Sequence, residues 1–226
     1  MKLYYMTAQE FGPRILRQRR LKISTVPELN DPFELLGASI GERDMRWIMQ
    51  LLHEHWTQTL GMICLTDNWH SPVMWAHYAQ KHHGFSFGFD VSDRPELISK
   101  IDYVPDRLRY SLQHTKRLPG VNQALLVQIL TTKYQAWSYE REYRLFTEIK
   151  DRDPDGRYYF DFGPDLILRE VILGARCELN LHSVASEIKS PPQRVEVFKA
   201  RPAVDSFRIV RDSGIPGITI DAVTSP

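Results

Sequence analysis

The stretch Trp137–Phe146, W-S-Y-E-R-E-Y-R-L-F, places two glutamates one residue apart among aromatic side chains and arginines. The alternation predicts a β-strand. Because strand side chains alternate between two faces, Glu140, Glu142 and Arg144 should share one face. That face is either a solvated surface, on which an ion pair stabilises little, or the wall of a site. From the residues alone, the solvated strand is the simpler interpretation.

The composition is that of an ordinary folded protein. With 226 residues, 42% of them hydrophobic and 25% charged, the chain can bury a sizeable core. Its net charge of +1 argues against a general attraction to nucleic acid or anionic membranes. Cys64 and Cys177 are far apart in sequence, so they suggest neither metal ligation nor a redox pair. With no signal-peptide pattern and no long apolar run, we expect a cytoplasmic protein.

Strands are expected along the whole chain, whereas helices are concentrated in its first two thirds, and this order favours an α+β fold over a regular βαβ alternation. The expected strands are 2–6, 21–24, 61–66, 84–90, 101–104, 137–146, 157–162, 166–173, 195–199 and 207–210. The expected helices are 13–20, one starting near Asp44, one running from Pro72 through Tyr78, one near 121–130, and 181–188.

The segment that separates the middle third of the chain from the last third gives no sign of a domain boundary. Asp151–Gly156, D-R-D-P-D-G, is a polar turn of the kind that joins two antiparallel strands. The sequence has no internal repeat and no low-complexity linker. We therefore expect one domain over residues 1–226, with a C-terminal tail at 211–226.

Several motifs have a plain structural interpretation beside a functional one. The four histidines between His70 and His83 lack a carboxylate or cysteine at helical spacing, so no metal site is expected. In L-N-D-P-F-E, Asp31 and Glu34 either belong to a stabilised turn or border a ligand pocket. Glycine-rich phosphate loops and G-x-S-x-G nucleophile motifs do not occur.

Six motifs, in the same order, resemble a bacterial and phage family catalogued only as domain-of-unknown-function family 2971. The resemblance covers about residues 3–210, with Leu29 and Thr66 as mild departures, and the closing I-L-G of Ile172–Gly174 also matches. The motifs are L-Y-Y at 3–5, L-N-D-P-F-E at 29–34, C-L-T at 64–66, M-W-A-H-Y-A at 74–79, G-F-S-F-G-F-D at 84–90 and W-S-Y-E-R-E-Y-R at 137–144.

The order of these motifs is also similar to the ADP-ribosyltransferase fold. That resemblance implies two small, mainly antiparallel sheets flanked by helices, with NAD held as substrate in a cleft between them. Glu142, with Glu140 two residues before it, would correspond to the E-x-E pair of such enzymes. A departure is that neither histidine nor arginine stands in the first strand. The NAD-binding residues implied are Tyr4, Tyr5, Thr66, Trp75, His77 and Tyr78, with Tyr78 stacked on nicotinamide.

The chemistry implied by this resemblance is cleavage of the bond between nicotinamide and ribose, which builds positive charge on the sugar. Glu142 would bind a ribose hydroxyl and support the cation, and Glu140 would orient or deprotonate the acceptor. Asp31, Glu34, Tyr139 and Arg144 would contact substrate. The acceptor would be a protein or a nucleic acid, in phage defence or a toxin system that includes a cognate antitoxin.

Two other classes stay open. A nuclease-like toxin would use His77, His82 and Glu142 for acid–base chemistry, with the basic clusters at 14–22 and 107–117 contacting phosphates. A non-catalytic interaction module would need none of these side chains for chemistry.

Overall fold

The structure is a computed structural model, and it describes residues 1–33, 38–39, 43–92, 94, 97–109 and 123–223. The chain forms two compact units, each built from segments that are distant in sequence. The first unit consists of Met1–Lys22, Leu65–Arg94 and Tyr159–Pro226, and the second of Ile23–Cys64 and Pro95–Tyr158. The expectation of a single domain stays a prediction.

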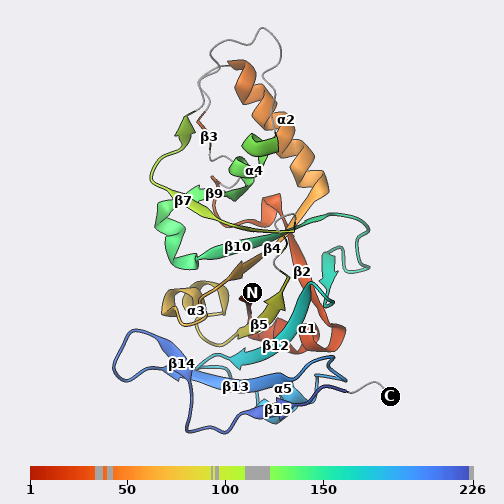
Figure 1. Cartoon of the computed structure of the whole chain (residues 1–226), viewed down its shortest axis with the longest axis vertical. Coiled ribbons are helices and arrows are strands. Elements are labelled where there is room, and N and C mark those ends of the chain that lie inside the picture. Colours follow the sequence, from red (N-terminus) through yellow and green to blue (C-terminus); the bar gives the residue numbers. More distant parts are fainter. Residues whose placement is uncertain (34–37, 40–42, 93, 95–96, 110–122, 224–226) are drawn as a thin grey trace. The chain divides into compact units, whose positions relative to one another are not determined.

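A mainly antiparallel sheet forms the first unit (Figure 1). β5 pairs antiparallel with β1 on one side and with β12 on the other, and β12 pairs parallel with β13. β14 and β15 both pair antiparallel with β13, so the segment that we expect to be a tail contributes a strand. The strands are β1 (Lys2–Thr7), β5 (Phe85–Val91), β12 (Leu166–Leu173), β13 (Val195–Pro202), β14 (Ile209–Arg211) and β15 (Ile218–Ile220).

β5 is buried on both faces from Phe85 to Phe89, although its alternation of aromatic and small residues is typical of a half-buried strand. Phe85, Phe87 and Phe89 on one face and Ser86 on the other are all inaccessible to solvent. The second face has room only for small side chains, because a Cβ at Gly88 would lie 2.9 Å from the ring of Tyr4. The serine and glycine of this strand therefore reflect crowding rather than exposure to water.

The helices of the first unit follow their sequence signals. The Oγ of Ser71 accepts a hydrogen bond from the backbone N of Met74, and Pro72 occupies the first helical position, as predicted. α1 ends at Arg19, whose backbone is left-handed with φ of 54°. The helical segments are η1 (Gln9–Phe11), α1 (Gly12–Gln18), α3 (Pro72–Tyr78) and α5 (Leu181–Ala185).

The second unit is organised around β4, which pairs with β2 and β10, and β10 also pairs with β6. Its core includes Val26, Trp56, Met62 and Ile129, from four different elements. Two parallel two-stranded sheets, β3–β8 and β7–β9, also belong to this unit. The elements are β2 (Arg20–Thr25), η2 (Val26–Glu28), β3 (Ala38–Ser39), α2 (Arg43–Thr59), β4 (Leu60–Thr66), β6 (Ile98–Lys100), β7 (Asp102–Val104), β8 (Leu108–Arg109), α4 (Gln123–Thr131), β9 (Thr132–Tyr134), η3 (Gln135–Glu140) and β10 (Glu142–Glu148).

Helices beside mainly antiparallel strands confirm the α+β class. β2 and β4 each contribute residues to both units. Among the described segments, no helix combines the length and the apolar character needed to cross a membrane.

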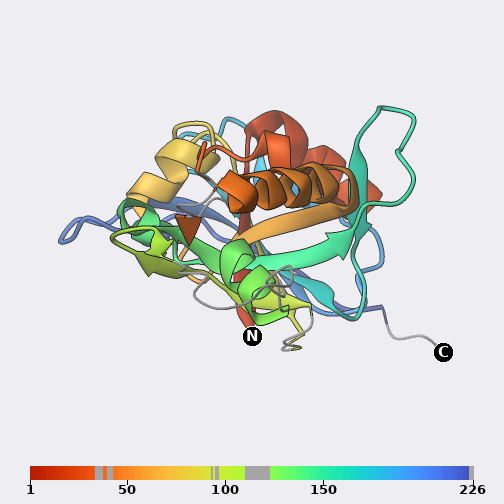
Figure 2. The ribbon, with the colours of Figure 1, turned by 90° about the horizontal axis from the view of Figure 1, so that it is seen from above.

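The D-R-D-P-D-G segment forms the predicted turn. The backbone N of Gly156 donates to the carbonyl of Asp153 at 2.8 Å, and Gly156 has φ of 79°, a conformation that favours glycine. Figures 1 and 2 show this segment as a loop extending from the end of β10 to β11 (Tyr158–Asp161). The two strands pair with different neighbours, since β10 pairs with β4 and β6 and β11 pairs with β2. The turn was thus predicted correctly, whereas the expected pairing of the two strands that it joins was wrong.

The prediction that Trp137–Phe146 is one strand is wrong for its first half. Residues up to Glu140 form the 3₁₀ helix η3, and β10 begins only at Glu142. Between them, Arg141 has φ of 47° and its backbone N donates to the carbonyl of Ser138 at 3.3 Å. A local turn therefore overrides the alternation of aromatic and charged residues.

Candidate functional site

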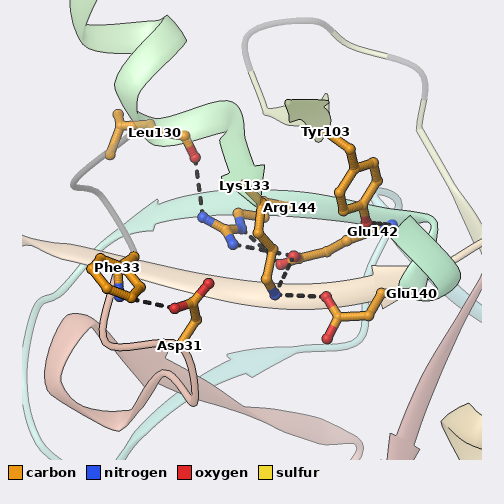
Figure 3. A network of polar contacts seen from close by, with 8 residues as sticks. All are labelled: Asp31, Phe33, Tyr103, Leu130, Lys133, Glu140, Glu142 and Arg144. Carbon is orange, nitrogen blue, oxygen red and sulfur yellow. Dashed lines mark hydrogen bonds and ion pairs between the residues drawn. The ribbon is translucent and has the colours of Figure 1, made fainter. Parts of the chain in front are cut away.

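Four charged side chains of the second unit meet in its interior (Figure 3). Lys133 comes from β9, Glu140 from the end of η3, and Glu142 and Arg144 from β10. The Nζ of Lys133 donates to Oε2 of Glu140 at 2.6 Å and to Oε2 of Glu142 at 3.1 Å. None of the four side chains is more than 6% exposed. We call this group the buried ion network.

Glu142 and Arg144 form the tightest part of the buried ion network. The Nε of Arg144 donates to Oε1 of Glu142 at 2.7 Å, and Nη2 donates to Oε2 at 3.1 Å. Nη1 of Arg144 donates to the carbonyl of Leu130 at 3.1 Å. Such two-pronged, charge-assisted pairs are stronger than neutral hydrogen bonds. The expectation of a weak pair on a solvated face is therefore corrected, because this face of β10 is buried.

The turn at Arg141 explains why both glutamates reach the same lysine. A left-handed residue, Arg141, connects the end of η3 to the start of β10, and the side chains of Glu140 and Glu142 converge although they do not share a strand. The start of β10 is fixed from both sides. The backbone N of Glu142 donates to the hydroxyl oxygen of Tyr103 at 2.8 Å, and its carbonyl accepts from the N of Ile101 at 3.0 Å.

Ion pairing keeps Glu142 charged in spite of its burial. Burial alone would raise the pKa of this carboxyl, but Arg144 and then Lys133 lower it, and the pKa falls to about 2. The nearby Cys64 thiol responds in the opposite sense, because burial and then the charge of Glu142 raise its pKa. Burial likewise raises the pKa of the Tyr103 hydroxyl. At neutral pH, Glu142 is thus an anion paired with the cations of Arg144 and Lys133, and it shares Lys133 with Glu140.

Lys133 also lines a cavity of about 300 Å³ in the same unit. The guanidinium of Arg107 lies over the ring of Phe33, 4.8 Å from its centre, and Tyr134 is half exposed. An aromatic wall with cations beside it is suited to a planar, anionic ligand. The full lining is Phe33, Val104, Pro105, Asp106, Arg107, Thr132, Lys133 and Tyr134.

Asp31 forms the turn that its sequence predicts. Its Oδ1 accepts from the backbone N of Phe33 at 2.9 Å, and the side chain is buried. In Figure 3 the carboxylate of Asp31 points toward the side where Lys133 and Arg144 lie. Glu34, the other acidic residue predicted from this motif, lies outside the described residues.

Tyr139 is half buried beside Trp137, with 6.1 Å between ring centres, and Nζ of Lys133 lies 5.1 Å from the centre of the Trp137 ring.

Sequence reasoning missed Lys133 and Tyr103. A lysine after an apolar helix and a tyrosine in a short strand carry no pattern that singles them out, so only their long-range contacts reveal them.

Two of the predicted NAD-binding residues, Tyr4 and Trp75, belong to the core of the first unit. Both lie in one hydrophobic cluster with Trp69. The Nε1 of Trp75 donates to the carbonyl of Trp69 at 2.6 Å, and the hydroxyl of Tyr4 donates to Oε2 of Glu170 at 3.2 Å. Burial and the negative charge of Glu170 raise the pKa of Tyr4. These contacts give both residues a structural role.

The other four predicted NAD-binding residues also lie in the first unit. Thr66 is buried opposite Tyr4, and its Oγ1 accepts from the backbone N of Asn68 at 3.1 Å. Tyr5 is half buried, whereas His77 is exposed with its ring centre 6.1 Å from that of Tyr78. Since the glutamate pair belongs to the second unit, the cleft that would unite all of these residues stays a prediction.

Within the described ranges, no three histidine, cysteine, aspartate or glutamate side chains are grouped so that they could hold a metal ion.

A sequence profile of the family described as "Protein of unknown function (DUF2971)" matches residues 74–145. The match supports the family resemblance. It begins within α3, covers the described elements from β5 to η3, and ends in β10 one residue after Arg144. No curated protein and no solved structure matches the chain. The matched range therefore includes all four residues of the buried ion network, while their chemistry must be argued from geometry.

Proposed function

We propose that the chain is an ADP-ribosyltransferase-like enzyme that consumes NAD and modifies a protein or nucleic-acid acceptor. The observation that carries this proposal is the convergence of Glu140 and Glu142 on Lys133, a residue that also lines the cavity of the second unit. The motif order supports an ADP-ribosyltransferase-like split-sheet core. A role in phage defence or a toxin system, with a cognate antitoxin, belongs to the same proposal.

The reaction breaks the bond between nicotinamide and ribose. Nicotinamide leaves with the bonding electrons, the ribose gains positive charge, and a nucleophilic group of the acceptor then bonds to the sugar and loses a proton. A carboxylate held beside the sugar stabilises the charge as it forms. With a pKa of about 2, Glu142 is available as an anion throughout the neutral range. Arg144 fixes its orientation.

Lys133 has a positioning role in this proposal. Its ammonium neutralises the two glutamates, and it stands at the boundary between them and the cavity. The diphosphate of a bound dinucleotide attracts Lys133 and Arg107 into the cavity. Two carboxylates then face the ribose with only Arg144 as counter-charge, which leaves net negative charge where the cation forms.

The direct test is incubation with NAD labelled in the nicotinamide and ADP-ribose parts, alone and with cell lysate as acceptor. We expect nicotinamide release that falls by about a hundredfold or more in Glu140→Gln and in Glu142→Gln, because each change removes a charge at the sugar. Glu148→Gln, on the exposed end of the same strand, is the matched control and should keep full activity. Unfolding midpoints for all three variants separate lost chemistry from lost folding. Absence of release in every lysate, together with no NAD-induced rise in unfolding temperature, would overturn the proposal.

One observation favours a second candidate, a non-catalytic ligand-binding module. Both oxygens of Glu142 accept hydrogen bonds from Arg144, and Oε2 also accepts from Lys133, so this carboxylate is satisfied without a ligand. A nucleotide that raises the unfolding temperature but is not consumed would support this candidate. Glu142→Gln should then lower the stability of the protein, while the nucleotide should still raise the unfolding temperature of the variant by the same amount.

A further inference from the structure

A second cavity, of about 290 Å³, lies in the first unit and is independent of the buried ion network. It is formed by the end of α1, the segment that enters β12, and residues 188–193 after α5. Its wall is mostly apolar. Leu16, Phe162, Ile167, Leu168, Ile188 and Pro191 contribute to it.

Among the residues that the structure describes, two cations and no acidic residue line this cavity. They are Arg19 and Lys189. Arg19 is half buried, and its guanidinium donates from Nη1 to the carbonyl of Lys189 at 3.4 Å, the long limit of a hydrogen bond. A guanidinium carries five N–H donors, and a lysine ammonium carries three. In the part of the chain that the structure describes, neither side chain pairs with a carboxylate.

The backbone around the cavity is held by hydrogen bonds. Arg19 closes α1 through its N, which donates to the carbonyl of Ile15 at 2.8 Å, and its own carbonyl accepts from the N of Phe162 at 2.8 Å. On the other side, the carbonyl of Pro191 accepts from the N of Val223 at 3.1 Å. A cavity with fixed walls binds a ligand with little loss of protein conformational entropy.

We propose that this cavity binds a small amphipathic anion, namely a carboxylic acid with an apolar body, whose carboxylate pairs with Arg19 and Lys189. The apolar wall stabilises the body by removing it from water, and the cations bind the head. The wall offers an inorganic anion few polar contacts, and a neutral apolar molecule leaves both cations without a counter-charge. The cavity is at the small end of the range for ligand sites, which suits a medium-chain fatty acid.

The test is titration calorimetry with octanoate and with its neutral analogue octanamide. We expect the full chain to bind one octanoate, about tenfold or more tightly than octanamide. The double variant Arg19→Gln/Lys189→Gln should lose this preference, because it should bind octanoate more weakly and octanamide as tightly as the parent protein does. As a matched control, Arg208→Gln/Lys81→Gln removes two exposed cations of the same unit that do not line the cavity, and it should bind like the parent protein.

A blocking variant, Gly163→Trp, provides an independent readout. Gly163 lines the cavity, and nothing lies within 4 Å of a Cβ added there, so a large side chain can be accommodated without a clash at its base. We expect Gly163→Trp to weaken the binding of octanoate and of octanamide to the same extent. No octanoate binding by the parent protein, equal affinity for the two probes, or full octanoate affinity in the folded double variant would each overturn the proposal. If Gly163→Trp does not fold, the double variant decides.

Discussion

At Glu142, burial and ion pairing act in opposite directions. Removal from water disfavours the ionised carboxyl, while Arg144 and Lys133 favour it, and the pKa of about 2 shows that pairing is the larger effect. Because of this balance, the stability of the protein is sensitive to substitutions in the buried ion network. A buried pair contributes modestly relative to apolar packing, but loss of one partner leaves an uncompensated buried charge.

We therefore predict that Glu142→Gln lowers the free energy of unfolding by about 3 kcal/mol, because Arg144 keeps its charge without its partner. Denaturant unfolding measures the change. Glu148→Gln, at the exposed end of the same strand, should change stability by less than about 0.5 kcal/mol. A loss in Glu142→Gln no larger than that of this control would show that the buried ion network does not stabilise the fold.

The lowered pKa of Glu142 also predicts acid sensitivity. Between its ordinary pKa of 4.5 and the folded value of about 2, the unfolded state binds more protons than the folded state. The contribution of Glu142, about 3 kcal/mol, is thus complete above its ordinary pKa and is lost as pH falls through 2. Unfolding free energies measured from about pH 6 down to about pH 3 should decline. The decline should be shallower in Glu142→Gln, and an identical slope would contradict the assignment.

At the scale of elements, the close approach of two backbone segments limits which residue can occupy a position more strongly than the preference of that residue for a helix or a strand does. Gly84, the residue immediately before β5, is the clearest case, because a Cβ there would overlap the carbonyl oxygen of Thr7 and lie 3.0 Å from Ala79. Both contacts involve backbone, which cannot move aside as a flexible side chain can. The sequence marks Gly84 only as the first residue of an expected strand.

We predict that Gly84→Ala destabilises the protein by about 3 kcal/mol, through a forced shift of β1 or of the segment after α3. Gly163→Ala is the matched control, since its Cβ meets no atom within 4 Å and its backbone is not left-handed. It should be neutral or stabilising by a few tenths of a kcal/mol. Thermal unfolding of the two variants checks both outcomes, and equal midpoints would contradict the backbone contact at Gly84.

At the scale of the whole molecule, each compact unit is assembled from segments separated by many residues. The first unit is centred on β5, which has a paired strand on each side and is buried on both faces from Phe85 to Phe89. The second unit includes sheets of only two strands, such as β3–β8. Two-stranded sheets are marginal without further packing.

This distribution predicts the order of amide hydrogen exchange. Amides of β5 should exchange most slowly, since buried central strands open only with large unfolding events. Amides of β3 and β8 should exchange much faster, through local opening. Exchange followed by mass spectrometry or NMR provides the measurement, and equal protection of β5 and β8 would contradict this prediction.

Local patterns in the sequence determined the α+β class, the five α-helices and most of the longer strands, because alternation, caps and turn residues act over a few positions. The short strands β3, β6, β8, β9 and β15 were not expected, because each of them depends on pairing with a segment that is distant in sequence or is too short to carry a pattern. Local patterns also singled out Glu140, Glu142 and Arg144 as a group. Only the tertiary structure decided that their face is buried, that Lys133 joins them, that η3 interrupts the expected strand, and that Arg19 and Lys189 border an apolar cavity. The physical reason is that burial, pKa and cavities depend on groups that are distant in sequence and adjacent only after folding.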